Sequence, residues 1–429
     1  MLDKSERSDY LISRSTESKK SKGYHMILRQ DMLDENSPDG LQVYQLTTET
    51  EVQSSHVYME AQIFTPDSKR LVLHRAAQSH APLPDPRHQY LLCDLENNGE
   101  LSPLTFEEKT TAPCLDPTGT WLYYFVCGTE TTPLKLNRVK LDGTERETLM
   151  VFDCDYPGTT FRHRGIYPLS TISPDGKRLV FCGKIGESEY GLTVIDLEKG
   201  SAELILSGPT WLNLHPQYTR NPANNHDIMI QESHNYRYDP VEKKIVNNPD
   251  GKGTDIHLIR DDGTNFRSLP WGRDGNEFCQ GHQCWIGRTD RTITSTHTRE
   301  PSSGRLIESL AAAADAGHLG LHTPGGRRSD LTRTFTDPYF YHFATDIAGK
   351  RLITDSADLF QGGRLFTADL GEPGEPASNW RYILSPKCSP YAPAPKGCHI
   401  HPFFSPDGRT AFFNSDESGI PQAFMICGI

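Results

Sequence analysis

The sequence lacks any apolar run near the roughly 20 residues that a membrane-spanning helix requires, and only 35% of its 429 residues are hydrophobic. Positive charge is also in deficit, since 44 Lys and Arg residues stand against 56 Asp and Glu residues and give a formal net charge of −12. Nucleic-acid binding depends on basic side chains that neutralise phosphates. We therefore expect neither a membrane nor a nucleic acid as a partner.

Two more features are missing. The first 26 residues are polar and mixed in charge, without the apolar run of a secretory signal, so we expect a cytoplasmic protein. The ten cysteines contain no Cys-x-x-Cys pair, and several stand in strand-like runs such as Leu179–Gly183. Most cysteines should therefore be small buried residues in a reducing compartment rather than disulfide partners.

Helical periodicity is scarce. The alanine-rich stretch Leu306–Gly317 is the one segment that favours a short helix. Elsewhere short alternating or β-branched runs are broken by Gly, Pro, Asn and Asp, which is typical of an all-β protein.

One unit recurs along the chain: an apolar strand, a Ser-Pro-Asp-Gly-like turn, and a second apolar strand. Clear copies begin at Phe64, Leu115, Ile172 and Phe404, a weaker copy begins at Thr345, and two degraded copies span Arg220–Ile230 and Ile286–Ser295. The spacing of roughly 50 to 65 residues lies near that of the long propeller repeats.

Each unit also carries a further strand pair, so four strands in seven copies predict an all-β, seven-bladed β-propeller. The segments Gly40–Thr47 and Gln422–Ile429 are expected to pair and close the ring between the N- and C-terminal strands. Residues 1–36 then form a flexible N-terminal tail, and residues 37–429 form the propeller. Two stacked β-sandwiches are the alternative, but they need a mid-chain linker that the sequence does not show. The oligomeric state stays open between monomer and homodimer.

Histidines recur where the innermost strand of each blade begins. His401 and His342 each lie seven residues before a turn glycine, and His282 and His215 hold the corresponding places in the degraded repeats. His399 shares a strand face with His401. Four further residues lie at or upstream of such positions: His56, Arg162, His163 and Arg164. The strand starts of a propeller converge at one mouth of its channel, so we expect these side chains to meet there.

Clustered imidazoles bind Mn, Fe, Ni or Zn, and imidazole is a general base near neutral pH. Arginine binds carboxylates through two parallel hydrogen bonds. Together these groups suit proton abstraction beside a carboxylate, the first step of β-elimination in a 4-linked uronic acid. The long polar insertion Glu232–Asp255 is a further candidate functional loop, in which His234 and Tyr236 are candidate substrate-binding residues.

The chain resembles the oligogalacturonate lyases, cytoplasmic seven-bladed propellers that cleave pectin fragments by β-elimination with bound Mn²⁺. The resemblance runs in order from about residue 40 to the C-terminus and rests on five segments: HVYMEAQIFTPDSKRLVL from His56, HPQYTR from His215, GHQCW from Gly281, YHFATDIAGKRLITDS from Tyr341, and HIHPFFSPDGRTAFFNSDESGIPQAF from His399.

By this resemblance His282, His399 and His401 are the metal ligands and His215 is the catalytic base. Lys396 stands where the family has a glutamine ligand. The stretch that carries the family's carboxylate-binding arginine has none here, so Arg164 or Arg220 takes that role.

These departures from the family pattern leave other uronate glycans open, namely ulvan or rhamnosyl-glucuronate chains. Lyases that act on such chains use His, Tyr and Arg, and Tyr167 or Tyr236 would then be the acid. The residues expected to contact a uronate oligosaccharide are His56, Arg162, His163, His234, Tyr236, His342 and Lys396. A non-catalytic binding propeller of the TolB type is the competing function. A propeller hydrolase or peptidase lacks support, because no Gly-x-Ser-x-Gly motif occurs.

Overall fold

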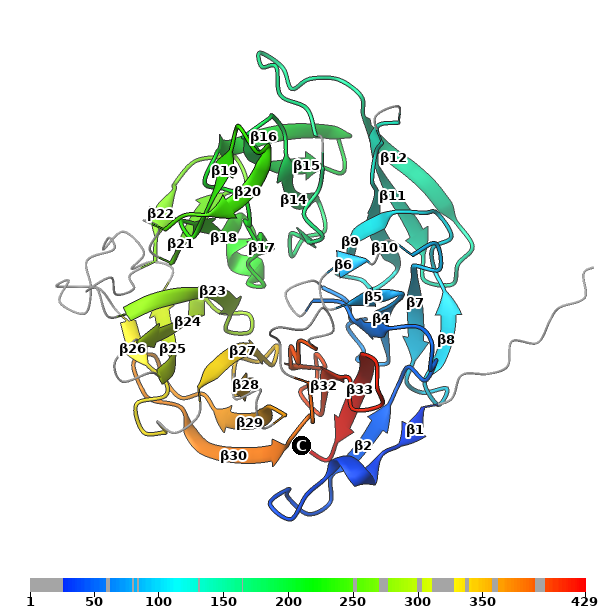
Figure 1. Cartoon of the computed structure of the whole chain (residues 1–429), viewed down its shortest axis with the longest axis vertical. Coiled ribbons are helices and arrows are strands. Elements are labelled where there is room, and N and C mark those ends of the chain that lie inside the picture. The colour runs from blue at the N-terminus through cyan, green and yellow to red at the C-terminus, as the bar shows by residue number, and fades with distance from the viewer. Residues whose placement is uncertain are drawn as a thin grey trace, which may run out of the picture.

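In the computed structural model, seven antiparallel sheets surround a central axis (Figure 1). The structure describes residues 26–429 except 59–61, 79–80, 83–84, 130–131, 164, 250–252, 270–276, 299–302, 311–327, 336–338, 357–361 and 390–397. The fold is the seven-bladed β-propeller that the repeats predict, and the alternative of two β-sandwiches is wrong.

The blades follow one another along the chain, and each is written here from its innermost strand outward. Blade one has β3 (Ser54–His56), β4 (Arg70–Arg75), β7 (Gln89–Asp94) and β8 (Glu100–Pro103). Blade two has β9 (Thr110–Leu115), β10 (Trp121–Val126), β11 (Leu134–Lys140) and β12 (Arg146–Phe152). Blade three has β13 (Ser170–Ile172), β14 (Arg178–Lys184), β15 (Tyr190–Asp196) and β16 (Ser201–Gly208). Blade four has β17 (Gln217–Tyr218), β18 (Asp227–Ser233), β21 (Thr254–Arg260) and β22 (Arg267–Ser268).

The remaining blades complete the ring. Blade five has β23 (Glu277–Trp285), β24 (Arg291–Thr298), β25 (Ser303–Leu310) and β26 (Arg328–Asp330). Blade six has β27 (Phe340–Thr345), β28 (Arg351–Ser356), β29 (Arg364–Asp369) and β30 (Ser378–Leu384). Blade seven has β31 (Phe403–Phe404), β32 (Thr410–Ser415), β33 (Gln422–Cys427), β2 (Gln42–Gln45) and β1 (Ile27–Leu28). Outside the blades lie two hairpins, β5 (Ala77–Gln78) with β6 (Ala81–Pro82) and β19 (Tyr236–Asp239) with β20 (Lys244–Asn247), and two short 3₁₀ helices, η1 (Gln30–Met32) and η2 (Pro222–Asn224).

The ring closes inside blade seven, where strands from the two ends of the chain pair. β2 pairs antiparallel with β33, with Gln42 opposite Cys427 and Gln45 opposite Phe424. Directly after β1 in the chain, Arg29 forms an ion pair with Glu417 at 2.5 Å. The predicted pairing of the two termini is confirmed, and it removes the open sheet edge that an unclosed ring would expose.

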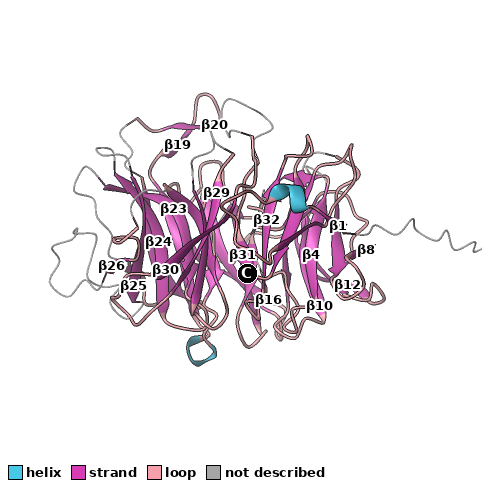
Figure 2. Cartoon of the chain, turned by 90° about the horizontal axis from the view of Figure 1, so that it is seen from below, coloured by secondary structure: helices cyan, strands magenta, loops and turns pink. Residues whose placement is uncertain are grey.

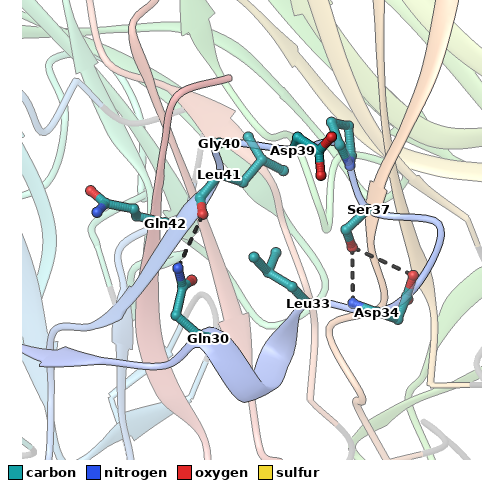
Figure 3. Close-up of a pocket in the computed structure, with 9 residues that line it drawn as sticks. Gln30, Leu33, Asp34, Ser37, Asp39, Gly40, Leu41 and Gln42 are labelled. Atoms are coloured by element: carbon teal, nitrogen blue, oxygen red, sulfur yellow. Dashed lines mark hydrogen bonds between the residues drawn. The ribbon is translucent and has the colours of Figure 1, made fainter.

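The expected flexible tail ends earlier than residue 36. β1 pairs with β2, and Met32 in η1 is fully buried. Figure 3 shows the segment after η1 looping round to the start of β2 and enclosing a pocket. The pocket has a volume of about 340 Å³. The Gln30 side chain donates to the carbonyl of Leu41, and the Ser37 hydroxyl accepts from the backbone N–H of Asp34. Residues 26–36 therefore belong to the propeller, and the rest of the expected tail lies outside the described residues.

The helix expected at Leu306–Gly317 is also wrong where the structure describes it. Leu306 and Ile307 lie in β25 and are both buried, with Leu306 opposite Ser295 of β24. Pairing with an existing strand edge outweighs the local helix preference of leucine and alanine, which is only a few tenths of a kcal/mol per residue. Residues 311–317 lie outside the described part of the chain.

The ten cysteines form no disulfide bond, and seven of them are buried, as the sequence predicts. Among the described residues, no helix has the length and apolarity to span a membrane.

The repeated turn lies between the first two strands of each blade, and side chains fix its shape. In blade three the Ser173 hydroxyl donates to Asp175 at 2.6 Å, and Asp175 accepts the backbone N–H of Lys177. Gly176, between Asp175 and Lys177, has a φ of +73°. This left-handed conformation is nearly free of strain only for glycine.

The turns also interlock from blade to blade. A Cβ built on Gly119 of blade two would lie 2.7 Å from the Cδ of Pro66 in the blade-one turn. Gly143, in the outer turn of the same blade, has a similar φ of +76° and no atom within 4 Å of its Cβ position.

We predict that Gly119→Ala destabilises the propeller more than Gly143→Ala. Both variants carry a left-handed alanine, which costs about 1–2 kcal/mol, but only Gly119→Ala adds an overpacked contact, at about 1–3 kcal/mol more. Thermal unfolding of the two variants beside wild type measures the difference. Equal melting temperatures for the two variants would show that the turns do not hold the blades together.

Candidate functional site

Four histidines lie on or just before the innermost strands of blades four to seven. His215 and His401 come two residues before β17 and β31, and His342 is the third residue of β27. In β23 and β27 the register shifts between Cys279 and Gln283 and between Phe340 and Phe343, so His282 and His342 lie within bulges. A bulge re-aims a side chain. The strand starts converge at the mouth of the ring opposite the repeated turns.

Three imidazoles from blades six and seven form one tight group. One ring nitrogen each from His342, His399 and His401 lies within 4.8 Å of the others, and the Nε2 atoms of His342 and His401 are 3.0 Å apart. The ring of His282 lies 4.6 Å from that of His342, centroid to centroid. Of the three expected ligands, His399 and His401 belong to this group. The third member is His342, expected to contact substrate, and the expected ligand His282 is placed beside the group by its contact with His342. We call these four residues the histidine cluster.

A buried carboxyl group orients the cluster. Asp355 on β28 accepts the backbone N–H of His342 at 2.7 Å, and its other oxygen lies 2.8 Å from His342 Nδ1. This contact directs Nε2 of His342 toward His401, which is how carboxylates commonly orient metal-binding histidines. Burial raises the pKa of Asp355 to about 8. A cation bound by the imidazoles would lower that pKa again.

His215 lies across from the cluster in a separate hydrogen-bonded pair. Its Nε2 is 2.6 Å from the hydroxyl oxygen of Tyr167. The buried ring of Tyr58 stands between the two groups, 5.3 Å from the ring of His215 and 4.6 Å from that of His401. Burial lowers the pKa of His215 to about 3, so its imidazole is uncharged at neutral pH.

Asn414 links the segment that carries His399 and His401 to blade one through hydrogen bonds. Its side-chain oxygen accepts the backbone N–H of His56 in blade one, and its amide donates to the carbonyl of His399. His56, expected to contact substrate, is wholly buried, and its Nδ1 lies 2.6 Å from the carbonyl of Val57. The expectation for His56 is wrong: this residue supports the joint between blades one and seven.

Arg220 does not lie with His215. It follows β17 at the far end of the strand and lines a cavity of about 440 Å³ together with the turn prolines Pro66, Pro117 and Pro406. That cavity occupies the opposite mouth of the ring. The two ends of an innermost strand face opposite mouths, so Arg220 cannot hold a carboxylate at His215.

Arg162 and His163 also lie elsewhere. They line a cavity of about 640 Å³ beside Phe152 and Cys127, between blades two and three. His163 is buried, with its Nε2 3.1 Å from the Thr193 hydroxyl. No contact joins either residue to the histidine cluster within the described chain.

The remaining expected residues fall into two groups. His234 lies 2.9 Å from Asp255 at the root of the β19–β20 hairpin, and Tyr236 is exposed on that hairpin. Arg164 and Lys396 lie outside the described residues.

Sequence reasoning missed Tyr58 and Asp355. Asp355 stands six residues after the turn glycine Gly349, and Asn414 stands six residues after Gly408. Aligning the repeats on their turns would therefore have shown a polar side chain at this place in blades six and seven. Tyr58 precedes residues that the structure does not describe, and its sequence gives no comparable signal.

Comparison with known proteins gives agreement in fold. No protein-family model and no curated protein matches the chain by sequence. An oligogalacturonate lyase solved in complex with manganese is 19% identical over 95% of this chain and 97% of its own, with a TM-score of 0.68. The oligogalacturonate lyase of Vibrio parahaemolyticus is 16% identical over 94% of this chain and 97% of its own, with a TM-score of 0.67. A COPII outer-coat chain is 10% identical over 86% of this chain and 83% of its own, with a TM-score of 0.51. The resemblance to oligogalacturonate lyases is thus confirmed at the level of the fold.

Proposed function

We propose that the protein is a lyase that cleaves a 4-linked uronate in an oligosaccharide by β-elimination, with oligogalacturonate as the first substrate candidate. One observation carries the proposal: the His215–Tyr167 pair and the histidine cluster face one another across Tyr58 at a single mouth of the ring. The His215–Tyr167 pair offers an uncharged proton acceptor, and the histidine cluster offers nitrogen ligands for a cation.

The His215–Tyr167 pair supplies the proton transfers of this reaction. His215 accepts the proton from C5 of the uronate, and the electron pair of the C5–H bond forms the C4=C5 double bond as the C4–O4 bond breaks. Tyr167 donates its proton to the departing O4. The 2.6 Å contact between Tyr167 and Nε2 of His215 then returns the proton from the imidazolium to the phenolate and resets both groups.

The histidine cluster fits a divalent metal ion. Donor atoms 3.0 Å apart match neighbouring ligands of an ion with bonds of about 2.1 Å, and Asp355 provides the outer support that such histidines usually have. A bound cation would hold the uronate carboxylate and stabilise the charge that builds on it. Manganese is our first candidate because one of the similar lyases was solved with it. The imidazole donors also suit zinc, iron or nickel.

The substrate and the compartment belong to the proposal as well. Ulvan and rhamnosyl-glucuronate chains are the alternative uronate substrates, since they undergo the same elimination. Ten cysteines outside any disulfide bond support a reducing, cytoplasmic setting.

We predict that His215→Ala lowers kcat at least about 100-fold, because a positioned proton acceptor contributes about 10²–10⁴-fold. Tyr167→Phe should lower kcat while leaving KM largely unchanged, since only its hydroxyl is lost. The unsaturated product absorbs in the ultraviolet and gives a direct assay on oligogalacturonate, ulvan and rhamnosyl-glucuronate.

His88→Gln is the matched control for this pair. His88 is a buried histidine of blade one that lies 3.0 Å from the Thr110 hydroxyl, so its loss tests the general cost of removing a buried imidazole. If wild type forms no unsaturated product on any of the three substrates, the lyase proposal fails.

We predict that Asp355→Asn weakens metal binding at the histidine cluster about 10- to 100-fold, because it replaces the carboxylate that orients His342. Titration of the metal-free protein with Mn²⁺ and Zn²⁺, followed by calorimetry, measures the affinity. Asp369→Asn, an exposed change on β29 of the same blade, should bind as wild type does. Equal affinity in both variants would contradict a metal ion at the cluster.

A further inference from the structure

The long insertion of blade four leaves the sheet between β18 and β21 and rises as the β19–β20 hairpin, clear of the body of the toroid (Figure 2). Four chelating side chains stand at its root: Glu232, His234, Asp255 and His257. Glu232 is paired directly opposite Asp255, and His257 lies two residues further along β21. Alternation along the strands places all four on the same face of the β18–β21 pair. We call them the hairpin-root group.

Their spacing is that of a ligand set. His234 Nε2 lies 2.9 Å from an oxygen of Asp255 and 3.8 Å from Oε2 of Glu232. His257 Nε2 lies 3.4 Å from the same oxygen of Glu232. Neighbouring ligands of an ion with bonds of about 2.1 Å are about 3.0 to 3.4 Å apart. The group therefore needs only small side-chain adjustments to surround a divalent ion.

The two carboxylates of the hairpin-root group, Glu232 and Asp255, would be stabilised by a cation. Directly opposed carboxylates on neighbouring strands repel each other. Burial increases that repulsion, and the side chain of Asp255 is only 7% exposed and that of Glu232 only 21%. Protons on the imidazoles or a metal ion would supply the missing positive charge.

The surrounding hydrogen bonds favour the metal ion. Nδ1 of His257 lies 2.9 Å from the Ser268 hydroxyl, and Oε1 of Glu232 accepts the hydroxyl of Thr210 at 2.5 Å. Each contact occupies one end of its group and turns the other end toward the shared centre. Outer partners of this kind orient the ligands of metal sites and fix their tautomers.

We propose that the hairpin-root group is a second divalent-cation site, built from residues distinct from the histidine cluster and independent of the proposed lyase activity. Two imidazoles and two carboxylates suit Zn²⁺ or Mn²⁺ better than Ca²⁺ or Mg²⁺. The bound ion links the end of β18 to the start of β21 and so secures the hairpin where it leaves the blade.

The test removes the histidine cluster first, so that metal bound elsewhere can be counted. His401→Ala in the full-length chain, dialysed against Zn²⁺ alone, should retain about one equivalent of metal by elemental analysis. His401→Ala combined with Glu232→Gln should retain none. His401→Ala combined with Glu242→Gln is the matched control, because Glu242 is an exposed carboxylate on the same hairpin.

Thermal unfolding gives a second reading that separates ligand loss from misfolding. Without metal, the variant with Glu232→Gln should unfold at the same temperature as His401→Ala or higher, since a like-charge repulsion is gone. With Zn²⁺, only the proteins that keep Glu232 should gain in melting temperature. The proposal is overturned if His401→Ala retains no metal, or if Glu232→Gln changes neither the retained metal nor the response to Zn²⁺.

Discussion

The antiparallel pairing of β2 with β33 is the interaction on which the arrangement of the site depends. It fixes blade seven, and blade seven carries His399 and His401 at the start of its innermost strand. Asn414, on the strand next to β31, binds the backbone of His56 in blade one and of His399 in its own blade. The position of these imidazoles relative to His342 in blade six therefore follows from closure of the ring. In an open ring, blade seven would lose its partner on one side and the cluster would lose half of its ligands.

The backbone conformation at the starts of the innermost strands is a feature of the fold rather than of the proposed site. His215 and His401 have φ values of +44° and +47°, and each precedes a proline. Such values are rare outside glycine and often mark functional sites. Ala112, however, stands at the same distance before its turn glycine as His401 and has a φ of +48°. The irregular conformation is thus a recurring feature of the innermost strands. The side chain that each blade places there decides whether a blade contributes to the site.

The sequence predicts features that depend on local chemistry and repetition. The turns could be predicted because Gly176 and its neighbours repeat with their hydrogen-bonding partners, and closure could be predicted from the strands left over at the two ends. His215 and Arg220 are close in the sequence, but they flank the two ends of β17, and these ends lie at opposite mouths of the ring. Closeness in sequence therefore does not predict that the two side chains meet. Leu306 was expected in a helix because pairing with β24 is a long-range interaction. Asp355 was missed because its importance comes from its contact with His342 after folding.

The net charge of −12 makes the cation central to the proposed chemistry. An anionic uronate is repelled by such a protein at long range, and uncharged imidazoles do nothing to offset that repulsion. His215 is neutral at neutral pH because burial lowers its pKa to about 3, and Arg220 lies at the opposite mouth. Developing negative charge on the substrate carboxylate needs a positive centre within a few ångströms, because screening weakens charge interactions beyond about 8–10 Å. A divalent ion held by His342, His399 and His401 would meet this requirement, close to the proposed base His215 and its partner Tyr167.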